Sequence, residues 1–229
     1  DPQERTNHFQ SFGYYCDASM VGASEIRPEM WLDEPFHNPD IDALAEQLRT
    51  RQTKTLAAGI DVIMADLKES MDTPPATCDH HTHALIYLYE HPRDPEREEP
   101  GSQWILGTQD QRAALRGAET VTVIASMIRL LGFEARAHTG SSTDIDLNRL
   151  AVASGLAEVR DGVLRNPYLG KDFGLAAITT TMDLAPDLPL APGSALSRLH
   201  SHGPAWWTGY GFAKNALTRA GLDPQSGVA

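Results

Sequence analysis

The segment between residues 111 and 138 constrains the fold most strongly, because it encodes a long helix followed at once by a strand. Over residues 111–131, apolar side chains recur every three or four positions, as in a helix with one buried face. Gly132 is suited to end this helix, and residues 133–138 then alternate apolar and polar side chains like a half-buried strand. The expected buried face comprises Ala114, Leu115, Ala118, Val121, Ile124, Ala125, Ile128 and Leu131. The pattern predicts a helix packed on a sheet.

Helix and strand patterns alternate along the rest of the chain. Residues 84–89 form an apolar and aromatic run of strand length, which predicts a buried strand. Asp144 ends a polar loop over residues 140–144 and is expected to cap a short helix that Gly155 stops. The other expected elements are a strand over 18–23, helices over 39–51 and 53–71, a proline-rich solvated loop over 91–101, a hairpin over 159–164 and a strand over 176–181.

This alternation predicts one α/β (α+β) domain of three layers. We expect the domain to cover residues 1–190, because the sequence becomes irregular after that point. Residues 191–229 are expected to form an irregular C-terminal extension with a short helix near 212–220.

Charge and cysteine content exclude several classes of function. The chain has 19 basic and 31 acidic side chains, a net charge of −12, which repels phosphate backbones and anionic membranes. No apolar run approaches the roughly 20 residues that span a bilayer. We therefore expect no nucleic-acid partner and no membrane partner. Two cysteines are too few for a disulfide framework, which favours a reducing cytoplasm, and a start at Asp1 rather than Met suggests a processed or excised segment.

A cluster of metal-binding residue types stands out near the middle of the chain. Cys78, His80, His81 and His83 lie within six positions, and thiols and imidazoles suit zinc, copper or nickel. On a strand, His81 and His83 would face one way and His80 the other, and no second cluster at ligand spacing accompanies them. The alternative is that these histidines hydrogen-bond to loops at a strand entrance. The sequence favours this alternative, so we assign no metal site.

Four segments, in order, resemble one known family. Residues 128–138 (IRLLGFEARAH) form a leucine–glycine–aromatic turn between helix and strand, and residues 148–158 (NRLAVASGLAE) match a LAVxAGLGE pattern. Residues 164–170 (LRNPYLG) and 184–190 (LAPDLPL) match a proline–aromatic–glycine turn and a TDLPLxxD strand end. Together they resemble the cobalamin-dependent reductive dehalogenases and their epoxyqueuosine reductase relatives, over about a third of the chain.

The resemblance implies a modified nitroreductase-like fold that cradles the corrin ring of cobalamin. In that arrangement Ser141, Asn148, Ala151 and Gly155 would line the corrin, because small residues let a backbone approach a large flat ligand closely. The alternative is that small residues near a helix end pack against a neighbouring strand.

The proton donor of the family is a tyrosine, and no motif identifies it here. Tyr87, Tyr89 and Tyr168 are candidates by residue type alone, and the apolar setting of the first two favours a place in the core. No catalytic residue is therefore assigned.

The family implies electron delivery by iron–sulfur clusters that this chain does not encode. In the family, two ferredoxin-like runs of cysteines follow the corrin domain, whereas residues 194–207 contain none. We therefore predict no iron–sulfur cluster on this chain and no activity in isolation. The missing clusters would lie on another chain or on a removed C-terminal part, or the chain is a duplicated corrin-fold module that has lost its cofactor.

The resemblance predicts an N-terminal or partial module of a reductive dehalogenase, an oxidoreductase that removes halide from a small organohalide. The duplicated copy without cofactor is the favoured version. Expected partners are an iron–sulfur or catalytic domain of the same or another chain, the organohalide and a second copy in a homodimer. One alternative is a non-catalytic structural or dimerisation module. Another is a flavin nitroreductase-like oxidoreductase, against which the lack of an arginine-rich phosphate-binding stretch counts.

Overall fold

The computed structural model describes residues 1–40, 43, 46–47, 77–91 and 95–190. The helices are α1 (Pro2–Tyr15), the 3-10 helix η1 (Pro28–Met30), α4 (Ser102–Ile105), α5 (Gln109–Leu130) and α6 (Leu147–Ala153). The strands are β1 (Met20–Glu25), β2 (Trp31–His37), β3 (His83–Glu90), β4 (Ala135–Thr139), β5 (Ser142–Ile145), β6 (Glu158–Arg160), β7 (Val163–Arg165) and β8 (Phe173–Thr180).

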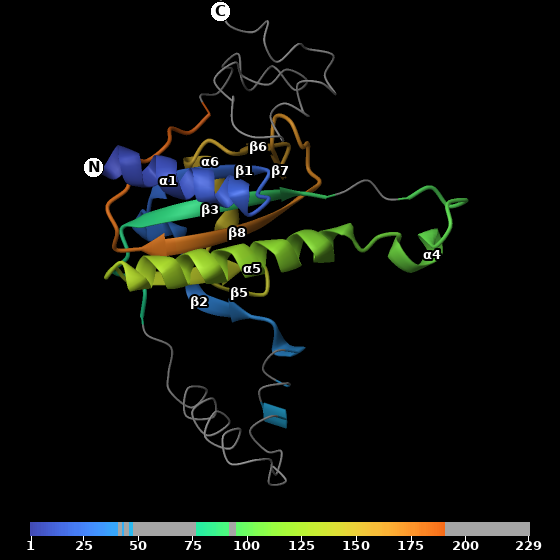
Figure 1. The fold of residues 1–229 in the computed structure, drawn as a ribbon, viewed down its shortest axis with the longest axis horizontal. Helices are drawn as coiled ribbons and strands as arrows, with labels where there is room; N and C mark the ends of the chain where they lie inside the picture. The colour runs from blue at the N-terminus through green and yellow to red at the C-terminus, as the bar shows by residue number, and fades with distance from the viewer. Residues whose placement is uncertain (41–42, 44–45, 48–76, 92–94, 191–229) are drawn as a thin grey trace, which may run out of the picture.

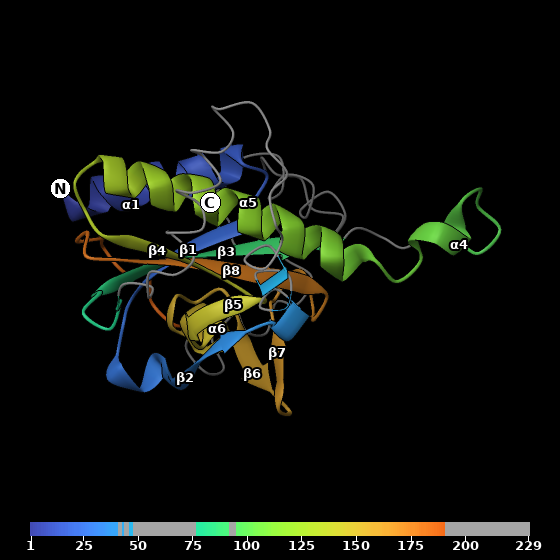
Figure 2. The same ribbon diagram turned by 90° about the horizontal axis from the view of Figure 1, so that it is seen from below.

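Six of the strands form one antiparallel sheet, which is covered on both faces. The strand order is β1-β3-β8-β4-β5-β2, and β6 pairs with β7 in a separate hairpin. Helices α1 and α5 lie on one face of the sheet, and α6 and the β6–β7 hairpin lie on the other (Figures 1 and 2). The expected three-layer α/β (α+β) arrangement is confirmed.

Strand β3 shows why the sheet has two cores. It pairs with β8 along its whole length and with β1 over residues 83–88. Leu85 and Tyr87 point into the core beneath α1 and α5, whereas Ile86 and Leu88 point into the core beneath α6. A strand between two covered faces needs apolar side chains at every position, which explains the continuous apolar run that predicted it.

Helix α5 was predicted correctly, but its buried face only in part: the structure confirms Val121, Ile124, Ala125 and Ile128. Leu115 is 70% exposed and Leu131 is 55% exposed. Gly117 lies on the buried face instead, and a methyl group there would be 3.0 Å from Cβ of Ala176. The helix approaches β8 through small residues, which a count of large apolar side chains cannot detect. The buried face comprises Ala113, Gly117, Thr120, Val121, Ile124, Ala125 and Ile128.

The expected polar loop over residues 140–144 is wrong, because β5 begins at Ser142. The turn after β4 is tight, since Thr139 pairs with Ser142 across it. Asp146, and not Asp144, caps α6 by accepting hydrogen bonds from the backbone N–H groups of Asn148 and Arg149. The cap lies two residues later than expected because β5 occupies the intervening positions.

Several elements were not predicted, among them η1, α4, β2 and α1. Strand β2 is charged, largely exposed and interrupted by Pro35, which suits its position at the edge of the sheet. Helix α1 begins at the N-cap Asp1, whose side chain accepts a hydrogen bond from the backbone N–H of Gln3.

Several other expected elements are confirmed where the structure describes the chain, whereas the domain boundary at residue 190 stays a prediction. The strands near 18–23 and 176–181 are β1 and β8, and the hairpin near 159–164 is β6–β7, with positive φ at Asp161 and Gly162. Residues 39–40, 43 and 46–47 are helical as expected for the helix over 39–51. The helices expected over 53–71 and 212–220 and the extension over 191–229 lie outside the described residues. None of the described helices has the length and apolar character that crossing a membrane requires.

The segment after β8 closes over the end of α6. The backbone N–H of Asp187 donates to the carbonyl of Ala23, and the Asp187 carboxylate accepts from the N–H of Ala23. This fixes Leu188 so that its carbonyl oxygen would be 2.3 Å from a methyl group placed on Gly155, which has φ +70°. Gly155 therefore permits a left-handed backbone and a close contact together.

We expect Gly155→Ala to lower the free energy of unfolding more than Gly162→Ala does. Both positions have positive φ, which costs a residue with a side chain about 1–2 kcal/mol, but no atom lies within 4 Å of a methyl group at Gly162. Urea denaturation of both variants measures the difference. Equal losses would contradict the close contact with Leu188.

Candidate functional site

The four residues expected to line a corrin ring fall into two groups. Asn148 is exposed at the start of α6, and Ser141 lies half-buried in the turn between β4 and β5. Asn148 lines a pocket of about 730 Å³ together with Gly140 of that turn and Phe173 of β8, a volume within the usual range for small-molecule sites.

The other two residues face the interior of the domain. Ala151 is fully buried in the core beneath α6. The space beside Gly155 is filled by the carbonyl group of Leu188. Ordinary packing therefore accounts for the small size of both residues, and the four do not form one open surface. Corrin binding through them remains a prediction.

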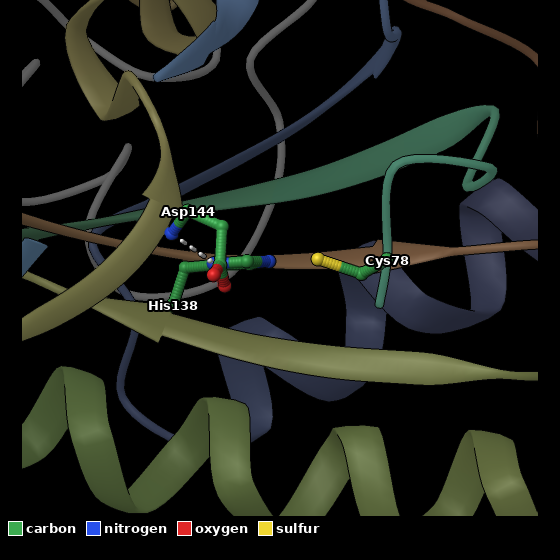
Figure 3. A group of neighbouring side chains, drawn as sticks. All are labelled: Cys78, His138 and Asp144. Atoms are coloured by element: carbon green, nitrogen blue, oxygen red, sulfur yellow. Dashed lines mark hydrogen bonds and ion pairs between the residues drawn. The ribbon is translucent and has the colours of Figure 1, made fainter. Parts of the chain in front are cut away.

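A second set of functional groups lies on the opposite face of the sheet from α5. Cys78 belongs to the segment before β3, His138 to β4 and Asp144 to β5. One potential ligand atom from each residue lies within 4.8 Å of the other two. The Cys78 sulfur points toward the His138 imidazole, beside which the Asp144 carboxylate lies (Figure 3). His138 is fully buried and Cys78 is 6% exposed.

A hydrogen-bond network around Thr179 orients the two buried imidazoles. The backbone N–H of Asp144 donates to Nδ1 of His138 over 3.3 Å, which assigns the His138 proton to Nε2. Nε2 of His138 then donates to Oγ1 of Thr179 over 2.8 Å. The Thr179 hydroxyl therefore donates its own hydrogen to Nδ1 of His81, which is also 2.8 Å away. One hydroxyl group thus fixes both rings.

Burial sets the protonation states of the cluster. Desolvation, followed by the positive charges of Arg136 and His81, lowers the pKa of His138 from 6.5 to about 3. Desolvation and the nearby Asp144 carboxylate raise the pKa of the Cys78 thiol to about 11. At neutral pH the cluster therefore holds a neutral imidazole and a thiol. The Asp144 charge is balanced by Arg136, whose Nε lies 2.6 Å from Oδ2.

The neighbouring histidines point in different directions. His80 lies at the surface, where its Nε2 is 2.5 Å from Oε2 of Glu134. His81 is buried, and His83 lies 3.7 Å from a carboxylate oxygen of Asp183. The expectation that His81 and His83 share one face of a strand does not apply, because β3 begins only at His83.

The sequence identified one member of the buried cluster and missed two. Cys78 was noticed because of the histidines beside it, whereas His138 and Asp144 lie about sixty residues further along the chain. Alternation in the strand over 133–138 placed His138 on the polar face. In the structure, other elements cover that face as well. The signal that could have identified His138 was a polar residue in a short strand rich in small residues.

The three candidate tyrosines show the features of packed side chains. Tyr87 is fully buried, and desolvation raises its pKa well above 10. Desolvation raises the pKa of Tyr89 to about 12 and also raises that of Tyr168. These shifts oppose the lowered pKa that would favour proton donation.

Thr179→Val should lower the free energy of unfolding by about 1–3 kcal/mol, because two buried imidazole nitrogens lose their shared partner. Thr122→Val is the matched control, since that hydroxyl is exposed on α5 and bonds only to the Ala118 carbonyl of its own helix. Urea denaturation measures both variants. A Thr179→Val protein as stable as the control would contradict the network.

Comparisons with known proteins agree with the motifs. No family model matches the sequence, and no curated protein matches it. A reductive dehalogenase whose structure suggests a mechanism for B12-dependent dehalogenation is 32% identical with a TM-score of 0.61, and the match covers 85% of this chain and 22% of that chain. The N-terminally tagged catabolic reductive dehalogenase NpRdhA is 30% identical with a TM-score of 0.63, over 98% of this chain and 24% of that one.

NpRdhA in complex with 3-bromo-4-hydroxybenzoic acid gives a similar match, with 32% identity and a TM-score of 0.60 over 87% of this chain and 23% of that chain. An epoxyqueuosine reductase bound to a tRNA stem loop is 12% identical with a TM-score of 0.47, over 86% of this chain and 51% of that chain. The chain spans less than a quarter of the dehalogenases it matches. Over most of its own length, the chain is thus a homologue of one segment of the reductive dehalogenases, the family that its motifs predicted.

Proposed function

We propose that the chain is a module of a reductive dehalogenase-type oxidoreductase that supports the catalytic part without holding cobalamin itself. In this proposal, the reaction of the whole protein is removal of halide from a small organohalide. Cobalamin and the iron–sulfur clusters belong to the remainder of the assembly. Support comes from identities of 30–33% to reductive dehalogenases and from matches to less than a quarter of their chains.

One observation carries the proposal that this module lacks its own corrin. The small-residue end of α6, where a close approach to a ligand was expected, is closed by the carbonyl group of Leu188. The Leu188 segment is held by three hydrogen bonds of Asp187, two to the backbone of Ala23 and one from the side chain of Gln10. A corrin ring could reach this end of the helix only if those bonds broke.

The pocket beside Asn148 favours a competing proposal, in which a corrin or a flavin binds at the start of α6. Asn148 is exposed, and its side-chain amide has no partner among the described residues; the pocket of about 730 Å³ combines apolar walls with Lys171 and Glu34. A structural or homodimer-forming module without any ligand is the other alternative.

Mixing the purified chain with hydroxocobalamin, desalting it and recording its absorption spectrum tests these proposals. We expect no retained corrin absorbance, and a reductive dehalogenase treated identically serves as the positive control. Retained absorbance in the wild-type chain that Asn148→Ala abolishes would overturn the proposal and place the corrin at the start of α6. The same measurement with FMN tests the flavin alternative, which predicts a yellow protein.

A further inference from the structure

We propose that Cys78, His138 and Asp144 form a binding site for a divalent metal ion of the zinc class. The three residues combine sulfur, imidazole nitrogen and carboxylate oxygen, which are the donors that zinc accepts in proteins. They come from three separate parts of the chain and meet at one point beside the sheet (Figure 3). The site is independent of the α6 region discussed above.

The distances suit a single metal ion. Ligand atoms about 2.0–2.3 Å from a tetrahedral ion lie about 3.3–3.8 Å from one another. Nδ1 of His138 and Oδ2 of Asp144 are already 3.7 Å apart. One ligand atom of each residue lies within 4.8 Å of those of the other two, so the Cys78 sulfur has to move closer to its partners before one ion can bind all three.

The network presents the correct nitrogen of His138. A metal ligand must offer a ring nitrogen without a proton, and the opposite nitrogen usually donates to a fixed partner. Nε2 of His138 donates to Thr179, which leaves the lone pair on Nδ1, where it accepts the backbone N–H of Asp144 over 3.3 Å. A metal ion bound at Nδ1 would replace that long hydrogen bond. Thr179 is itself fully buried, which holds the ring in this orientation without a metal.

Arg136 is compatible with a bound cation because a carboxylate has two oxygens and about four acceptor positions. Asp144 can therefore keep its contact with Arg136 while it binds a metal. Metal binding breaks the S–H bond of Cys78, forms a sulfur–metal bond and releases the proton to solvent. The thiolate and carboxylate contribute two negative charges, which the divalent ion neutralises. With Arg136 included, the net charge of the site is then +1.

Solvent reaches the Cys78 side of the cluster, although neither His138 nor Asp144 lines the pocket there. A pocket of about 570 Å³ opens beside the cluster and is lined by Cys78, His81 and Arg136, among others. Three protein ligands with one open position are the arrangement of zinc sites that bind water or a small ligand. His80, His81 and Glu134 form a competing group at the rim of this pocket. There Glu134 is 65% exposed and already pairs with His80, which makes it the weaker candidate.

Titration of the metal-free, reduced chain with Co²⁺ tests the site. Bound cobalt should give a thiolate-to-metal charge-transfer band in the near ultraviolet that saturates at one equivalent and disappears when Zn²⁺ is added. No such band, or a band that requires several equivalents, would overturn the proposal.

Variants assign the ligands. Cys16→Ser leaves Cys78 as the only thiol of the chain, so the band must survive in this variant, whereas Cys78→Ser must abolish it. His80→Gln should leave cobalt binding unchanged, and Thr179→Val should weaken it about 10- to 100-fold, as loss of a partner of a ligating histidine commonly does. A band lost with Cys16→Ser or His80→Gln would place the metal elsewhere. Circular dichroism checks that each variant is folded. If Cys78→Ser fails to fold, the titration of Cys16→Ser still tests the site.

Discussion

The pairing of β8 with β3 on one side and β4 on the other is the interaction on which the rest of the structure depends. Ile178 of β8 lies opposite Leu85 of β3 and Ala137 of β4, beneath α5. The next residue, Thr179, points to the other face of the sheet, where it meets His81 and His138. Because both faces are covered, a single register buries an apolar core beneath α5 on one side and, on the other, a polar network next to the second apolar core. A slip of one residue would exchange the two sets.

The sequence predicted those parts of the fold that depend on local patterns. The continuous apolar run of β3, the positive-φ turn of the β6–β7 hairpin and the helical periodicity of α5 each have a local physical cause. Strand β2 was missed because its charged, exposed side chains resemble a loop, and its pairing with β5 is long-range. Asp144 was misassigned as a helix cap because a short strand of polar residues cannot be distinguished locally from a loop.

The candidate sites show the same limit. Asn148 was placed correctly at an accessible helix start, but the filling of the space beside Gly155 by Leu188 depends on a segment more than thirty residues away. Cys78 attracted attention through its histidine neighbours, of which only His81 contacts the buried network. His138 and Asp144 join Cys78 through strand pairing, which residue spacing does not encode. The roles of these small residues and histidines therefore depend on contacts that form only when the sheet is assembled.

The central claim is that the sheet register assembles a metal site from Cys78, His138 and Asp144. Anomalous diffraction from crystals of the chain soaked in Zn²⁺, measured on both sides of the zinc absorption edge, tests this claim most directly. The account predicts one edge-dependent peak between the Cys78 sulfur, Nδ1 of His138 and the Asp144 carboxylate. The absence of a peak there, or a peak only between His80 and Glu134, would contradict it.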